Sequence, residues 1–100
     1  MKNPYLNKQD RVDLMQRKLI IYSIAYYEFS NNIISDMVYD KLAKRYYKAM
    51  ASSGDLLEAS QYYYCMKDFH PSTGFDIYKK LNKKDKKYLT KMTNHILSLK

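Results

Sequence analysis

The stretch YYEFSNNIISDMVYDKL, residues 26–42, decides the fold because one helical pattern ends in it and another begins. Between Asp10 and Phe29, apolar residues recur in alternating steps of three and four, which is the spacing of one face of a long amphipathic helix. The short polar residues that follow, Ser30, Asn31 and Asn32, compete for backbone hydrogen bonds and tolerate turn conformations. The first helix should therefore end at this polar break.

A second helix is expected directly after the break. Ser35 is a natural N-cap, and the carboxylate of Asp36 in the first turn is favoured by the positive end of the helix dipole. Apolar residues then continue at helical spacing to about Ser52, and Gly54 suits a left-handed stop. Because the connection is short, the two helices over residues 10–52 should form an antiparallel hairpin.

The whole chain has the composition of a small all-α protein. Its 100 residues predict a single domain, and two glycines and two prolines stand against many strong helix formers. Residues 55–100 should add further helices to the hairpin, giving four or five in all. The segment LLEASQYYYCM, residues 56–66, is ambiguous because three consecutive tyrosines also suit a strand, but leucine, glutamate and alanine favour a helix.

Two details of the C-terminal half are predicted locally. Asn82 precedes Asp85 by three residues, which resembles a capping box at the start of a last helix. Cys65 is the single cysteine, so no internal disulfide can form, and this fits a reducing compartment. Its neighbours Tyr64 and Met66 indicate that it fills the core rather than acting as a nucleophile.

The residues around the turn of the hairpin carry the most chemistry. A helix turns about 100° per residue, so Asp36, Tyr39 and Asp40 share one side near the start of the second helix. Tyr26 and Tyr27, at the end of the first helix, should converge on them. Aromatic faces stack on planar rings, carboxylates accept hydrogen bonds from ribose hydroxyls, and amides at a helix start can meet a phosphate. Such a corner can hold a nucleotide.

The same residues resemble a known family. Tyr26-Tyr27, a variable stretch, and then Ile-Ser-Asp-x-x-Tyr-Asp-x-Leu at residues 34–42 are similar in their whole spacing to the N-terminal helical domain, called Ia, of bacterial NAD-dependent DNA ligases. The resemblance covers roughly residues 14–52. In that family the domain closes over NAD and holds its nicotinamide mononucleotide (NMN) half while a lysine of the neighbouring domain takes the adenylate.

The resemblance implies a role for each of five residues. Tyr26 and Tyr27 would stand at the two aromatic positions, Tyr39 would flank the nicotinamide, and the carboxylates of Asp36 and Asp40 would face the ribose and the ring amide. The implied ligands are NAD, NMN or ADP-ribose. The chain has no Lys-x-Asp-Gly and no room for the other ligase domains. We therefore expect an accessory or regulatory protein without enzymatic activity.

Each of these residues also has a purely structural reading. Asp36 can simply complement the helix dipole, and Asp40 can pair with Lys44 one turn later on an exposed face. Amphipathic helices also bury tyrosines routinely. Core packing is the interpretation that we expect for three of them, Tyr22, Tyr46 and Tyr47.

The net charge of +8 is concentrated at the C-terminal end. Residues 79–100 hold eight lysines and one aspartate, with tyrosines between the lysines, as on nucleic-acid-binding surfaces, although a solvated helix face explains them equally well. The candidate contacts are Lys79, Lys80, Lys83, Lys84, Lys86 and Lys87. His70 and His95 have no cysteine or second histidine at ligand spacing, so no metal is expected.

Two alternatives to nucleotide binding stay open. The helical pair can dock on a host protein, such as a DNA ligase, with a vestigial nucleotide site, or the lysine-rich end can bind nucleic acid. No apolar run reaches the roughly 18 residues that cross a bilayer, and no hydrophobic signal region begins the chain, so we expect a cytoplasmic protein without membrane contact. The high lysine, asparagine and tyrosine content is compatible with a phage gene, which would place the protein in the host cytoplasm.

Overall fold

The computed structural model describes residues 7–31, 33–52, 54–67, 69–70 and 77–99, and this part of the chain is all-α, as predicted. It contains six helices and no strand where four or five helices were expected, because the chain between the long helices folds into three short ones. The helices are α1 (Lys8–Phe29), α2 (Asp36–Ser52), α3 (Gly54–Glu58), α4 (Tyr63–Met66), α5 (Ile77–Lys80) and α6 (Lys83–Ser98).

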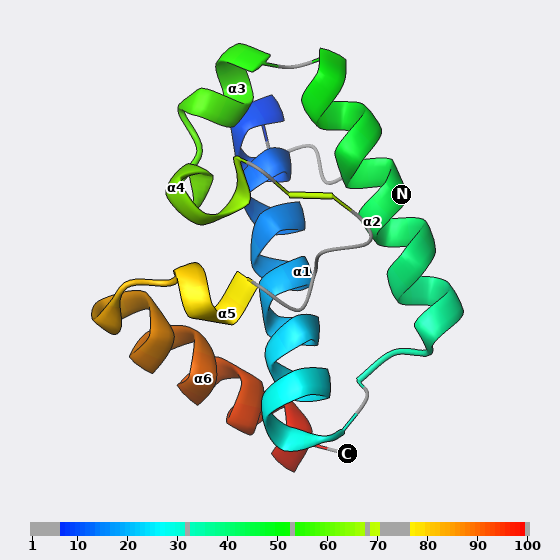
Figure 1. Cartoon of the computed structure of the whole chain (residues 1–100), viewed down its shortest axis with the longest axis vertical. Helices are drawn as coiled ribbons and strands as arrows, with labels where there is room; N and C mark the ends of the chain where they lie inside the picture. Colours follow the sequence, from blue (N-terminus) through cyan, green and yellow to red (C-terminus); the bar gives the residue numbers. More distant parts are fainter. Residues whose placement is uncertain (1–6, 32, 53, 68, 71–76, 100) are drawn as a thin grey trace.

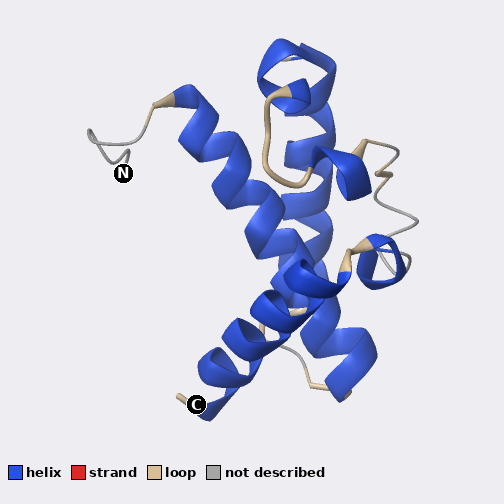
Figure 2. Cartoon of the chain, turned by 90° about the vertical axis from the view of Figure 1, so that its left-hand side faces the viewer, coloured by secondary structure: helices blue, strands red, loops and turns tan. Residues whose placement is uncertain are grey.

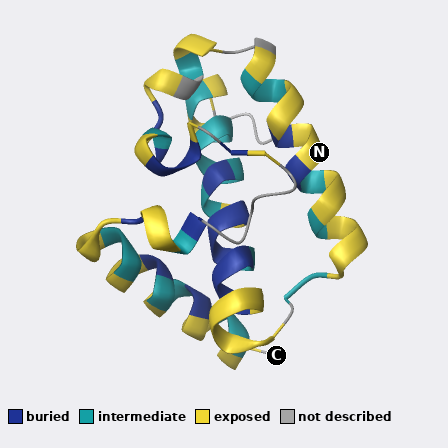
Figure 3. Cartoon of the chain, in the orientation of Figure 1, coloured by how far each residue is buried: buried dark blue, intermediate teal, exposed yellow. Residues whose placement is uncertain are grey.

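Helix α1 is the central element of the fold. It lies between α2 on one side and the short helices and α6 on the other (Figure 1), and its middle turns are buried (Figure 3). The buried positions are Gln16, Leu19, Ile20, Ile21, Ser23, Ile24 and Ala25. The predicted single apolar stripe is therefore wrong for this helix: it is covered from both sides in the middle, whereas Tyr26 and Phe29 at its end are exposed.

The hairpin of α1 and α2 forms as predicted. In Figure 1 the two helices run in opposite directions, joined at the polar break. Ser30 takes the left-handed conformation (φ 50°, ψ 38°), and its N–H and that of Asn31 donate to the carbonyl oxygen of Ala25. Ser35 Oγ accepts from the N–H of Val38 at 3.2 Å, which is the expected N-cap contact of α2.

The chain after α2 differs from the prediction at Gly54. No described glycine has a positive φ, and Gly54 is the first residue of α3 instead of a left-handed stop. The ambiguous segment over residues 56–66 is helical, as favoured, but it is divided into α3 and α4 by a turn. The sequence also predicts a loop over residues 68–74, and most of that range lies outside the described residues.

Helix α6 begins with a modified form of the predicted capping box. The side chain of Asn82 accepts from the N–H of Asp85 at 2.8 Å, as expected. The reciprocal bond runs through a third residue: Asn82 N–H donates to the hydroxyl oxygen of Tyr64 at 3.2 Å, and that hydroxyl donates to the Asp85 carboxylate. The short aspartate thus closes the box through Tyr64, which also links α4 to α6.

Gln16 is a buried polar hub that connects three parts of the fold. Its amide nitrogen donates to Tyr46 Oη on α2 at 3.0 Å and to Ser60 Oγ at 2.6 Å. Its amide oxygen accepts from the N–H of Tyr62 at 3.3 Å. Apolar side chains surround this hub, and Figure 2 shows the helices that supply them crossing at the centre of the molecule. Tyr46 and Cys65 belong to this core, as predicted.

Candidate functional site

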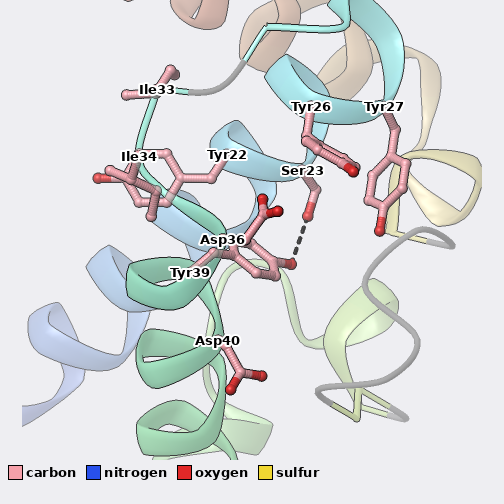
Figure 4. A pocket seen from close by; sticks show the side chains of 9 residues that line it. All are labelled: Tyr22, Ser23, Tyr26, Tyr27, Ile33, Ile34, Asp36, Tyr39 and Asp40. Atoms are coloured by element: carbon pink, nitrogen blue, oxygen red, sulfur yellow. Dashed lines mark hydrogen bonds between the residues drawn. The ribbon is translucent and has the colours of Figure 1, made fainter.

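A pocket lies in the corner where α1 ends and α2 begins (Figure 4). Its volume is about 380 Å³, toward the lower end of the roughly 300–1,000 Å³ found for small-molecule sites. Residues from α1, from the connection and from α2 line it: Tyr22, Ser23, Tyr26, Tyr27, Ile33, Ile34, Asp36, Tyr39 and Asp40. All five residues that the sequence indicated, at the end of one helix and the start of the next, therefore line the same pocket.

Two tyrosines at the end of α1 form one side of the pocket. The rings of Tyr26 and Tyr27 meet edge to face, with centroids 4.7 Å apart and planes at 87°. Both side chains remain nearly half exposed, at 46% and 48%. Their mutual contact holds the two rings at a site that solvent reaches, where one ring face can stack on an incoming planar ring.

Tyr39 forms the floor of the pocket from α2. It is half-buried, and its hydroxyl lies 2.8 Å from Ser23 Oγ on α1 (Figure 4). One hydroxyl of such a pair donates and the other accepts, so the pair keeps one further O–H for another acceptor. This bond ties the two helices together across the site.

Two phenols of the pocket, those of Tyr39 and Tyr27, keep their protons at ordinary pH. Burial raises the pKa of Tyr39, although the hydrogen bond from Ser23 offsets part of the rise. Partial burial also raises the pKa of Tyr27, with further contributions from Tyr26 and Asp36. Since an unperturbed tyrosine already ionises near pH 10, these side chains act as hydrogen-bond donors and stacking surfaces.

The carboxylates give the pocket its charge. Asp36 points toward the tyrosines in Figure 4, and it has no salt-bridge partner among the residues that the structure describes. Asp40, one turn later, forms the predicted pair with Lys44, whose Nζ lies 2.9 Å from Oδ2. No lysine or arginine is among the described side chains that line the pocket. The site therefore favours a ligand group that is positively charged or rich in hydrogen-bond donors.

Four of the residues that line the pocket were not predicted as site residues from the sequence. Tyr22 had been assigned to the core, and the interpretation is incomplete because its half-buried ring also faces the pocket. Ser23 is the small polar residue within the run Ile-Ile-Tyr-Ser-Ile-Ala. A hydroxyl buried in such a run needs a hydrogen-bond partner, and this requirement could have indicated Ser23. Ile33 and Ile34 carried no signal of their own, since their place depends on the path of the connection.

The other nominated residues lie elsewhere. Tyr47 is 43% exposed and contacts the ring of His70, so its assignment to the core is wrong. The lysines nominated for nucleic acid lie on α5 and α6, and among them Lys86 is half-buried with its Nζ 5.0 Å from the ring centroid of Tyr78. Burial raises the pKa of the Cys65 thiol to about 12.

In the described part of the chain, no three histidine, cysteine, aspartate or glutamate side chains gather closely enough to hold a metal ion. None of the described helices has the length and apolar character to span a bilayer.

Comparisons with known proteins add no assignment. The chain matches no model of a protein family, no curated protein and no solved structure.

Proposed function

We propose that the corner pocket binds the nicotinamide mononucleotide half of NAD, or free NMN, and that the chain acts as a non-catalytic accessory or regulatory protein. The observation that carries the proposal is the convergence of the five residues that share the ligase Ia spacing. Tyr26, Tyr27, Asp36, Tyr39 and Asp40 line one pocket although eight residues of sequence separate Tyr27 from Asp36.

The volume of the pocket supports a ligand of mononucleotide size. At about 380 Å³ it is too small to enclose a complete dinucleotide, but it suits one half of it. The adenylate half of NAD would then remain outside the pocket, as it does in the ligase family, where a different domain takes it.

The charge of the pocket supports the oxidised nicotinamide ring in particular. This ring carries a positive charge, and tyrosine faces attract cations through their π-electrons. The carboxylate of Asp36, which forms no salt bridge with any residue that the structure describes, lines the same pocket as these faces. Reduced NMN, whose ring is neutral, should therefore bind more weakly than oxidised NMN.

Isothermal titration calorimetry with oxidised NMN, reduced NMN and AMP tests the proposal. Oxidised NMN should bind, and AMP, which lacks nicotinamide, should not. Asp36→Asn should weaken NMN binding by about tenfold or more, because a hydrogen bond to a charged group contributes roughly 1.5–3 kcal/mol. Asp55→Asn is the matched control, because it makes the same charge change on α3, at a position that does not line the pocket.

A second pair of variants tests the stacking surface. Tyr26→Ala removes an exposed ring from the pocket, and Tyr47→Ala removes an exposed ring outside it. We expect only the first to weaken NMN binding. Absence of binding at millimolar NMN, or equal losses in both variants, would contradict the proposal.

Docking on a partner protein is the second candidate function. Met37 and Val38, at the start of α2, are 68% and 50% exposed, which is unusual for two adjacent apolar side chains. If NMN does not bind, capture of one specific protein by wild type but not by Met37→Ser, Val38→Ser would favour this candidate.

A further inference from the structure

A second, separate surface of the molecule is strongly basic. Six exposed lysines form it, and we call them the basic face: Lys79 and Lys80 of α5, and Lys83, Lys84, Lys87 and Lys91 of α6. The pocket lies between α1 and α2, whereas α5 and α6 lie on the other side of α1 (Figure 1). The two features can therefore act independently.

Helical geometry places the α6 lysines on one side. At about 100° per residue, Lys83, Lys84, Lys87 and Lys91 fall within an arc of about 100° and extend along about 12 Å of the helix. The opposite side of α6 holds the buried Leu89 and Thr93. The four α6 lysines thus form a stripe that faces solvent, and the exposed Lys79 and Lys80 directly precede this helix in the chain.

The charge of this stripe is not neutralised by the rest of the described molecule. None of the six lysines has a salt-bridge partner in the ranges that the structure describes. Asp85 is the one acid between Lys79 and Lys91, and the Tyr64 hydroxyl and Asn82 hold it in the capping network. Lys86 does not belong to the basic face, because it turns back over the ring of Tyr78. The surface is therefore ready for an external polyanion.

Tyr88 gives the basic face a stacking surface. It is 48% exposed and lies next to Lys87, and helical geometry puts it about 40° beyond Lys84 on the same side of α6. Lysines that track a backbone and an exposed aromatic ring that stacks on a base are the two elements of single-strand recognition. A membrane fits less well, because interfacial helices insert an apolar side, and that side of α6 is packed inward.

We propose that the basic face binds single-stranded nucleic acid, with its lysines contacting phosphates and Tyr88 stacking on a base. Phosphate contacts release counterions, so log K should fall linearly with log salt, by about 0.7 for each phosphate neutralised on a single strand. Six lysines therefore set an upper limit of about 4 for the magnitude of this slope.

Fluorescence anisotropy tests the proposal. It measures the affinity of the full chain for a labelled 20-mer of thymidine at salt concentrations from about 50 to about 300 mM. The triple variant Lys84→Gln, Lys87→Gln, Lys91→Gln should reduce the slope by about 2. The control variant Lys18→Gln, Lys41→Gln, Arg45→Gln removes the same charge from exposed positions of α1 and α2 and should leave the slope unchanged. Circular dichroism verifies that both variants fold.

The stacking contact has its own readout. Tyr88→Ala should weaken binding about tenfold, while Tyr88→Phe, which keeps the ring, should bind like wild type. No binding at the lowest salt, or equal effects of the two triple variants, would overturn the proposal. Tighter binding to phosphatidylserine vesicles than to the oligonucleotide would overturn it in favour of a lipid surface.

Discussion

At the scale of single residues, the geometry of the pocket depends on Ser23 as well as on the five residues that the sequence indicated. The serine is buried, and its hydroxyl is the partner that fixes Tyr39 across the helix pair. Because Ser23 fixes the position of Tyr39, we expect that its loss weakens the affinity of the pocket for its ligand.

Ser23→Ala is expected to weaken NMN binding by about three- to tenfold, since a hydrogen bond contributes about 0.5–1.5 kcal/mol and Tyr39 would lose its fixed position. Calorimetry measures the affinity, and Ser98→Ala, whose exposed hydroxyl donates to His95 far from the pocket lining, is the control. Unchanged affinity in Ser23→Ala would show that Tyr39 needs no such support.

Among the polar side chains, Gln16 is the one whose removal should lower the free energy of unfolding most. Gln16→Ala removes the core partner of the Tyr46 hydroxyl and of the N–H of Tyr62. Each buried group left unsatisfied costs about 1–3 kcal/mol, so the free energy of unfolding should fall by at least about 2 kcal/mol. Urea unfolding measures it, with the exposed Gln61→Ala as control; a loss below about 0.5 kcal/mol would contradict the role of the hub.

At the scale of elements, helix ends were predictable and helix environments were not. The polar break after Phe29, the Ser35 cap and the Asn82 cap are local signals, and all three work in the structure. The burial of α1 on both sides depends on α6, which is far away in sequence, so the periodicity of α1 alone did not show that Phe29 is exposed. On α2, the one wrong assignment is Tyr47, which was expected in the core and is exposed.

The pocket likewise has residues that the local sequence predicts and residues that it does not predict. Its five nominated residues could be found because a short connection forces the ends of two helices together and because their spacing is specific. Ile33 and Ile34 could not, since the path of the connection is set by the left-handed turn at Ser30. Local sequence thus predicts which elements meet, and packing decides what else lines the space between them.

The turn at Ser30 yields a prediction about the connection itself. A non-glycine residue in the left-handed conformation costs roughly 1–2 kcal/mol, and glycine adopts it without strain. Ser30→Gly should therefore raise the free energy of unfolding by about 0.5–1 kcal/mol after the greater chain entropy of glycine is subtracted. Urea unfolding measures it, with Ser98→Gly at the end of α6 as the comparison. A destabilised Ser30→Gly variant would show that the serine side chain has a role in the turn.

At the scale of the whole molecule, one buried thiol makes stability depend on alkaline pH. Burial raises the pKa of Cys65 from 9.0 to about 12, and burial likewise raises the pKa of Tyr46 to about 12. In the unfolded chain these groups lose their protons at lower pH, so the unfolded state is favoured as pH rises from about 9 to about 12.

The comparison of wild type with Cys65→Ala isolates this effect. The stability difference between them should be constant below pH 9 and shrink above it, because only the wild type has a thiol that ionises on unfolding. Urea unfolding at about pH 7.5, 9 and 10.5 measures the difference in the free energy of unfolding between the two proteins. A difference that stays constant to the highest pH would mean that the thiol is accessible in the folded protein.

The complete molecule combines two surfaces with opposite preferences: a carboxylate-bearing pocket between α1 and α2, and a basic face on α5 and α6. A titration of ¹⁵N-labelled protein with oxidised NMN, followed by amide chemical shifts, distinguishes them residue by residue. We expect the shifts to concentrate on residues 22–27 and 33–40, and Asp36→Asn to raise the NMN concentration that they require by about tenfold or more. Shifts confined to the lysines of α5 and α6, or none at millimolar NMN, would contradict the proposal that this corner holds a nicotinamide mononucleotide.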